Sequence, residues 1–194
     1  LTLGRQRGYL SDPYKLVQKN TQLFPVVMRP LTFAENRPRE REKWVALATA
    51  NRAFPRAHGA VDFAYRYYHD GYGTDAHTVD LAWFQRLGGK VILRPAFRYY
   101  DQSAANFYYY RLDGTSVVPQ SGLPRPQGPF YSSDYRLSAF RTYTYGLKVI
   151  YRPHDAFQLD AALEQYDMRG RDGVTPASAY CEAAVLTLGA KFSW

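Results

Sequence analysis

Cysteine is almost absent from this 194-residue chain, in which Cys181 is the single example. A disulfide framework and a cysteine-rich zinc module are therefore excluded. Long apolar runs are missing too. No run of aliphatic residues and alanine is longer than that at 183–186, whereas a membrane-spanning helix needs roughly 18–20 apolar residues. A helical membrane protein is excluded, and the contents of 46% hydrophobic and 22% charged residues exclude a disordered chain.

Aromatic residues are abundant instead, with 18 Tyr, 11 Phe and 3 Trp making up 16% of the chain. A tyrosine hydroxyl must be paired or hydrated, so many tyrosines favour strands that cross a boundary between polar and apolar surroundings. The length suits one domain over residues 1–194 with a sizeable core. The chain begins at Leu1 without Met or a leader, which indicates that it is processed or lacks its original start.

Period-two alternation recurs along the sequence and predicts an all-β fold. For example, Val61, Phe63 and Tyr65 fall on one side of a strand. Asp62, Ala64 and Arg66 fall on the other side. The same pattern predicts about eight strands, over 1–7, 44–54, 59–68, 77–86, 91–100, 144–152, 157–164 and 186–194.

The connections between these strands alternate in length. Three are tight turns with Gly or Pro, at 55–58, 87–90 and 153–155. The others are longer and polar, at 9–42, 69–76, 101–136 and 169–179. Bacterial outer-membrane barrels have short periplasmic turns and long extracellular loops. The alternation therefore predicts an antiparallel up-and-down transmembrane β-barrel, with its C-terminus periplasmic and its long loops, above all 9–42 and 101–136, extracellular.

Charges of both signs gather on one face of the predicted strands, where they would set the charge of a lumen, as a pore lining or as structural ion pairs. They are Arg66, Arg86, Arg94, Arg98, Lys148, Lys191, Asp62, Asp80, Asp160 and Glu164. The opposite face is apolar, with Tyr, Trp and Phe near strand ends, and would meet outer-membrane lipid. A soluble antiparallel sheet with one hydrated face is the alternative.

The C-terminal strand carries a second marker of this fold class. Apolar residues occupy every second position up to the last residue, at Leu186, Leu188, Ala190, Phe192 and Trp194. This pattern resembles the signal by which the barrel-assembly machinery recognises outer-membrane precursors. An ordinary final strand that ends in an aromatic residue would also produce it. We interpret Leu186, Leu188, Phe192 and Trp194 as the assembly signal.

Two segments are near copies, 63–70 and 95–102, as repeated hairpins of an up-and-down barrel would be. A family resemblance is carried by the motifs at 8–15 (GYLSDPYK), 75–78 (DAHT), 93–95 (LRP) with 98–100 (RYY), and 133–138 (SDYRLS). The chain resembles DUF3570, a family of outer-membrane β-barrel proteins of unknown function, from about Gly8 to Trp194. Family members are usually longer at the N-terminal side. The resemblance therefore leaves open that this chain is the C-terminal part of a larger barrel.

Two sets of side chains are candidates for a metal site and for a hydrolase site, as alternatives to a purely structural role. His69, Asp70, Asp75 and His77 flank one loop and are of metal-binding types, but their spacing matches no metal motif. Ser103, Ser132 and Ser133, with His77, supply the residue types of a hydrolase at the extracellular rim. No diagnostic spacing accompanies either set. We therefore assign no catalytic residue, metal or cofactor, interpret Cys181 as structural, and keep the outer-membrane hydrolase as the alternative.

The formal net charge is +8, but the basic residues are spread along the chain among acids. Without a basic helix or a phosphate-binding loop, nucleic acid is an improbable ligand. The long loop 101–136 combines Tyr108, Tyr109 and Tyr110 with several prolines, and suits either a plug or a docking site for a partner protein. The sequence therefore favours a non-enzymatic barrel that acts as a pore or as a sheath or scaffold for partner proteins.

Overall fold

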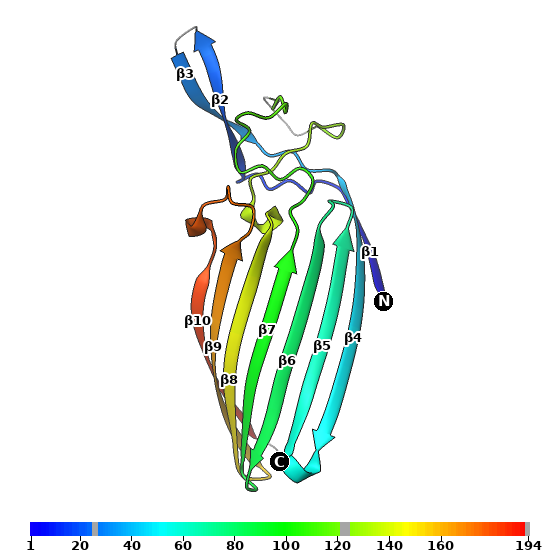
Figure 1. Cartoon of the computed structure of the whole chain (residues 1–194), viewed down its shortest axis with the longest axis vertical. Coiled ribbons are helices and arrows are strands. Elements are labelled where there is room, and N and C mark those ends of the chain that lie inside the picture. Colours follow the sequence, from blue (N-terminus) through cyan, green and yellow to red (C-terminus); the bar gives the residue numbers. More distant parts are fainter. Residues whose placement is uncertain (25–26, 121–124, 193–194) are drawn as a thin grey trace.

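The computed structural model describes residues 1–24, 27–120 and 125–192. It is an all-β structure dominated by one large antiparallel sheet (Figure 1). The strands of that sheet are β1 (Thr2–Arg7), β4 (Glu40–Phe54), β5 (Gly59–Asp70), β6 (Asp75–Leu87), β7 (Val91–Gln102), β8 (Phe140–His154), β9 (Phe157–Gly170) and β10 (Glu182–Phe192). Three 3₁₀ turns lie in the connections: η1 (Pro55–Ala57), η2 (Tyr135–Leu137) and η3 (Ala177–Ala179).

The sheet has the order β1-β4-β5-β6-β7-β8-β9-β10, so that from β4 onward every strand pairs with its neighbours along the chain. Each of its eight strands overlaps one that the alternation predicts, although β4, β8 and β10 begin four residues earlier and β9 ends six residues later than predicted. The last two residues of the predicted strand 186–194 lie outside the described residues. Within the described residues the two edge strands do not pair, and the sheet is open rather than a closed barrel. One reason is that the short β1 pairs only with 40–45 of β4 and leaves the rest of that strand as a free edge.

The two ends of the sheet differ, as the loop lengths predict (Figure 1). The tight connections 55–58, 88–90 and 155–156 lie at one end, where Phe192 of β10 also pairs with Phe157. The segments 8–39, 71–74, 103–139 and 171–181 lie at the other end. The expectation of a long loop at 69–76 is wrong.

The connection between β5 and β6 is instead a tight turn over 71–74. Its inner end is held by the Asp70 carboxylate, which accepts hydrogen bonds from the backbone N–H groups of Tyr72 (2.9 Å) and Thr74 (3.2 Å). Because an aspartate can stabilise a turn in this way, the two strands extend to Asp70 and Asp75.

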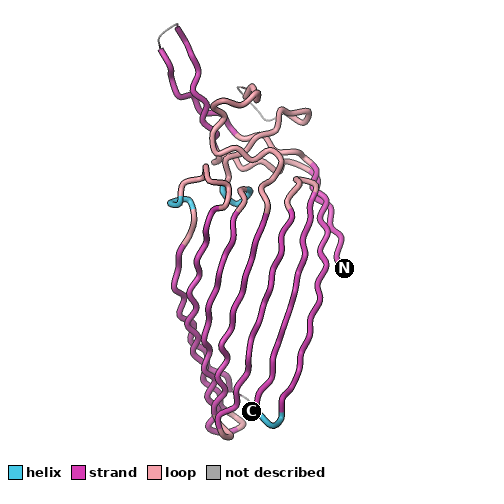
Figure 2. Tube along the Cα trace, viewed as in Figure 1, coloured by secondary structure: helices cyan, strands magenta, loops and turns pink. Residues whose placement is uncertain are grey.

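Within the segment predicted as the loop 9–42, the structure contains a hairpin of β2 (Leu16–Phe24) and β3 (Val27–Ala34). It projects from the loop end of the sheet, clear of the other strands (Figure 2). No apolar alternation runs through this segment because most of the ribbon has no buried face. Only its base is covered, where Val17 is buried and Phe33 packs against the same cluster. Pro30 lies within β3, which such an edge position tolerates.

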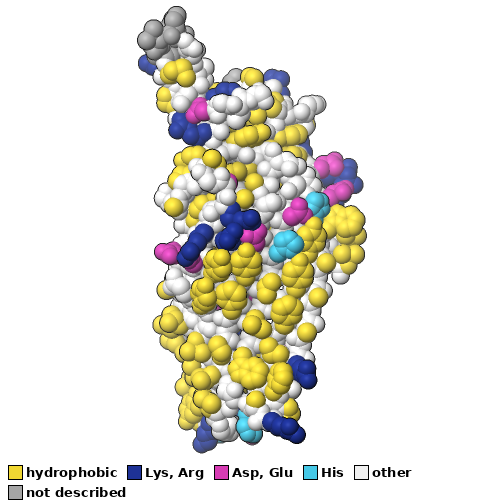
Figure 3. Space-filling model, in the orientation of Figure 1, with side chains coloured by type: hydrophobic (Ala, Val, Ile, Leu, Met, Phe, Trp, Pro, Cys, Tyr) yellow, Lys and Arg dark blue, Asp and Glu magenta, His cyan; other side chains and the backbone are white. Residues whose placement is uncertain are grey.

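The two faces of the large sheet differ in chemistry. On β8, the side chains of Tyr145, Leu147, Val149 and Tyr151 point to one face and are 54%, 49%, 37% and 42% exposed. Apolar side chains cover this face over much of the sheet, with charged residues and histidines above them (Figure 3). The other face carries the charged residues. Among the described residues, no helix has the length and apolar character needed to cross a membrane.

The buried hydrophobic clusters lie in the connections at the loop end. One comprises Tyr72, Ala105, Phe107 and Leu137. The other comprises Val17, Leu112 and Tyr131. We call the described residues of 8–39 and 103–139 the cap. The fold therefore consists of a sheet with exposed apolar side chains and a separately packed cap across one end.

Candidate functional site

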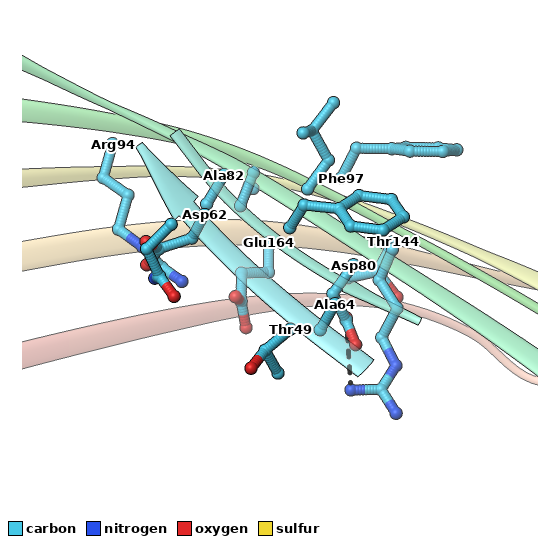
Figure 4. Close-up of a pocket in the computed structure, with 15 residues that line it drawn as sticks. Thr49, Asp62, Ala64, Asp80, Ala82, Arg94, Phe97, Thr144 and Glu164 are labelled. Atoms are coloured by element: carbon cyan, nitrogen blue, oxygen red, sulfur yellow. Dashed lines mark hydrogen bonds and ion pairs between the residues drawn. The ribbon is translucent and has the colours of Figure 1, made fainter. Parts of the chain in front are cut away.

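Five of the charged residues predicted for the lumen line one hollow on the polar face. The register places Asp62, Asp80, Arg94, Arg98 and Glu164 on neighbouring strands from β5 to β9, around a volume of about 550 Å³. In Figure 4 the carboxylates of Asp62, Asp80 and Glu164 extend to the same side of the strands, and the Phe97 ring lies on the other. Five of the ten predicted residues therefore line one hollow, and the lumen role predicted for them stays a prediction.

Polar contacts across the strands hold part of this face together. Arg98 Nη1 lies 3.4 Å from Asp80 Oδ1, in a directly opposed pair of residues. Lys148 Nζ lies 2.8 Å from Asp160 Oδ2. Asn51 donates a hydrogen bond to Asp62. The hollow is therefore a mixed-charge surface, with its acids and bases partly neutralised by cross-strand pairing.

The other predicted charges are spread along the same face. The Arg94 guanidinium carbon lies 5.2 Å from the centroid of the Phe84 ring. Arg86 lines a second hollow, of about 540 Å³, near the tight turns. Arg66 lines a third, of about 150 Å³, next to the cap. Lys191 lies near the end of β10, opposite Gln158.

Two glycines on this face make room for carboxylates. A Cβ atom at Gly146 would lie 3.2 Å from Cγ of Glu164, and one at Gly189 would lie 2.9 Å from both Asp160 carboxylate oxygens. These two glycines and the lining residues Thr49, Asn51 and Thr144 are not among the predicted site residues. The charge pattern cannot predict them, because they contribute space and hydrogen bonds rather than charge.

A second group of charged residues, which the sequence analysis also missed, is buried in the cap. The Glu35 side chain is fully buried, and it accepts hydrogen bonds from the Asp12 backbone N–H and from Ser132 Oγ. Arg37 Nε lies 2.7 Å from Glu35. Arg37 Nη2 lies 2.8 Å from Asp134. Arg37 therefore joins the two segments of the cap, which are 97 residues apart in the chain.

Arg136 completes this network by binding Asp134 at 2.7 Å and approaching Asp12 at 3.5 Å. Burial opposes ionisation of Asp134. The hydrogen bonds from Arg136 and Arg37 outweigh that effect, and the pKa of this carboxyl lies below its usual value. The motifs at 8–15 and 133–138 thus meet in the cap, and their conspicuous residues Asp12, Asp134 and Arg136 serve to pack it.

The residues considered for a metal site divide between the two faces. His69 Nδ1 lies 2.9 Å from Asp75 Oδ1, and the Tyr67 hydroxyl donates to the same carboxylate. Asp70 is fully buried and binds Arg41, with its carboxylate 2.8 Å from Nε. In the described part of the chain, no three His, Cys, Asp or Glu side chains are placed to hold a metal ion.

The residues considered for a hydrolase have other partners. His77 Nδ1 lies 2.7 Å from the Tyr65 hydroxyl. Ser103 Oγ accepts a hydrogen bond from the Asp75 backbone N–H at 2.9 Å. Ser133 Oγ donates to the Leu16 carbonyl at 2.8 Å. Each of these side chains is thereby engaged in holding a strand or loop end.

The residues of the predicted assembly signal are exposed on the apolar face. Leu186, Leu188 and Phe192 are 67%, 72% and 67% exposed. The fourth, Trp194, lies outside the described residues. Cys181, directly before β10, is exposed and has a free thiol.

Comparison with known protein families matches residues 1–186 to the model of a family described as a protein of unknown function, DUF3570. The chain belongs to DUF3570. No curated protein and no solved structure matches it. For this DUF3570 chain, the function must therefore be argued from its own geometry.

Proposed function

We propose that the chain forms the wall of a β-barrel in the bacterial outer membrane, with the polar face lining a charged pore. The observation that carries the proposal is the apolar face. Its large side chains, such as Leu147, Leu163 and Leu188, are 49%, 59% and 72% exposed. Continuous apolar surface on this scale is a liability in water and is expected where lipid covers it.

The residues that border the apolar face above and below support its assignment as a lipid-facing band. Above it, Asp101, Arg141 and Arg169 follow one another across β7, β8 and β9. Below it, the rings of His154, Phe157 and Phe192 lie next to one another, tilted by 34° at each contact. On β8, the distance from Tyr143 to His154 is about 36 Å along the strand, or about 28 Å across a membrane at a typical tilt. Aromatic girdles flank a band of about this height in outer-membrane barrels.

The ends of the sheet suggest an orientation. Tight turns and the end of β10 would face the periplasm, and the cap would face outward, as in other barrels of this class. The exposed Leu186, Leu188 and Phe192 would be read by the barrel-assembly machinery before insertion. Because the eight described strands leave both edges unpaired, the complete barrel would need additional strands to close. A larger barrel of that kind could enclose water.

The test is single-channel recording of the purified protein in a planar bilayer under a salt gradient. We expect stepwise, salt-dependent currents. Replacing Arg94 and Arg98 with Glu should shift the reversal potential toward cation preference, because both line the central hollow. Arg56→Glu in the turn η1 makes the same kind of charge change away from the hollow and is the control. Selectivity that does not respond to Arg94 and Arg98 would contradict the pore.

A second candidate, a sheath or scaffold for partner proteins, is favoured by the β2–β3 hairpin. It projects beyond the rest of the cap and exposes Leu16, Met28 and Leu31, at 54%, 61% and 37%. If this candidate is correct, a folded barrel will be electrically silent. Cross-linking in intact cells will then capture a partner through a probe placed at Met28, and a probe at Arg56 will capture none.

A further inference from the structure

We propose that a small oxyanion, with one phosphate or carboxylate group, binds in the hollow between the sheet and the cap. The hollow has a volume of about 150 Å³. Its polar lining is formed by Arg41 of β4, Arg66 and Tyr68 of β5, Thr74, Tyr100 and Gln102 of β7, and Arg136 of η2. Binding at this site does not require the protein to conduct ions, so this proposal is separate from the pore proposed above.

The lining of this hollow has charge of one sign. Three arginines line it and no carboxylate does, whereas Asp62, Asp80 and Glu164 line the central hollow. Arg41 binds Asp70, and Arg136 binds Asp134 and approaches Asp12. None of these acids lines the hollow, and Asp70 and Asp134 are only 0% and 1% exposed. The wall therefore presents guanidinium groups to the hollow, with their neutralising carboxylates outside it.

Arg66 provides the uncompensated charge. Within the described residues it has no carboxylate within ion-pair distance, and its guanidinium carbon lies 5.8 Å from the centroid of the Tyr68 ring. Arg41 and Arg136 each use Nε and Nη2 to bind their aspartates. A guanidinium has five N–H donors, so both retain donors on Nη1. Guanidinium groups bind phosphate and carboxylate through such forked donors.

Thr74 supplies an independent indication that something binds here. Its side chain lines the hollow, the residue is only 4% exposed, and Oγ1 has no hydrogen-bond partner among the described residues. Buried polar atoms are almost always paired, with protein, with ordered water or with a bound ligand. A hydroxyl can donate to an oxyanion that the arginines attract. The unpaired Thr74 hydroxyl and a lining of three arginines without a carboxylate thus point to the same kind of ligand.

The volume restricts the size of that ligand. At about 30 Å³ per water molecule, the hollow holds roughly five waters. A single phosphate or carboxylate group fits within that space, and a nucleotide or an oligosaccharide does not. The side of the hollow formed by Arg136 belongs to the cap, so an ion bound there would also join the cap to the sheet.

The test is calorimetric titration of the purified full-length protein with inorganic phosphate and, separately, with acetate. Binding of either anion is expected, and the tighter one identifies the group. Arg66→Gln should weaken binding by about tenfold or more, because it removes charge-assisted hydrogen bonds. Thr74→Val should weaken it several-fold, and Thr74→Ser, which keeps the hydroxyl, should retain it. Thermal unfolding of each variant checks that it is folded.

Two further substitutions separate a built site from general attraction to positive charge. Arg52→Gln removes one positive charge from an exposed position on β4, beside the Phe54 ring, and should leave binding unchanged. Arg94→Gln removes one from the central hollow of the polar face. If Arg94→Gln weakens binding as much as Arg66→Gln, attraction is diffuse and the proposal fails. It also fails if neither anion binds to the folded protein.

Discussion

At the scale of single residues, the most informative positions are carboxylates that are buried but fully engaged. Glu35 and Asp134 are each about 99% inaccessible, and both lie within reach of Arg37. A buried charge is costly without partners, so the network is stable only when all of its members are present. It follows that the cap depends on a few residues whose loss cannot be compensated by water.

Asp134→Asn tests this dependence, with a definite pH signature. The pKa of Asp134 is lowered by its arginine partners, so its charge stabilises the folded cap above about pH 4 and ceases to do so as the pH falls through the lowered pKa. At pH 7 we expect the variant to lose on the order of 1–3 kcal/mol of local stability, measured as hydrogen-exchange protection of the amides of 136–138. Near pH 3 the difference from wild type should shrink. A difference of equal size at both pH values would refute an ionic role.

At the scale of elements, consecutive side chains of each strand in the large sheet point to opposite faces, one apolar and one polar. Phe63 and Ala64 are consecutive on β5, with Phe63 on the apolar face and Ala64 between Thr49 and Asp80 on the polar face. Phe63→Arg should reduce folding stability in lipid vesicles by about 2–4 kcal/mol, as a charge facing lipid does. Ala64→Arg places the same charge beside acids, and should cost much less. Equal losses in urea unfolding titrations would argue against a membrane-facing sheet.

The same period-two geometry explains how much of the fold can be predicted from sequence. All eight strands of the large sheet follow from alternation, because a sheet with two different environments imposes it on every strand. The hairpin β2–β3 does not follow, because only its base, at Val17 and Phe33, packs against other residues. The tight turn 71–74 does not follow from alternation either, because it depends on hydrogen bonds to the Asp70 carboxylate. The central hollow could be predicted from charged residues on one face, whereas Glu35 and Arg37 are buried only through contacts 97 residues away.

At the scale of the whole molecule, the cap and the sheet are stabilised in different ways. The hydrophobic clusters of buried residues belong to the cap and the adjoining turn, and the sheet is held by strand pairing with its large apolar side chains exposed. The cap crosses the end of the sheet at which the predicted pore would open (Figure 1). Its packing should therefore control access to the polar face.

Arg37→Gln is the substitution that should release the cap as a unit. Arg37 is 11% exposed, and removing its charge leaves the carboxylates of Glu35 and Asp134 close together with less compensation, at a cost of about 3–5 kcal/mol. We expect faster proteolysis within 103–139 in lipid vesicles, together with a larger single-channel conductance. Arg39→Gln, on the same segment but exposed, removes an equal charge and should change neither. If the cap controls access to the polar face, loosening it must change the current. Faster proteolysis without a change in conductance would therefore mean that the cap packs on the sheet without restricting access to the polar face.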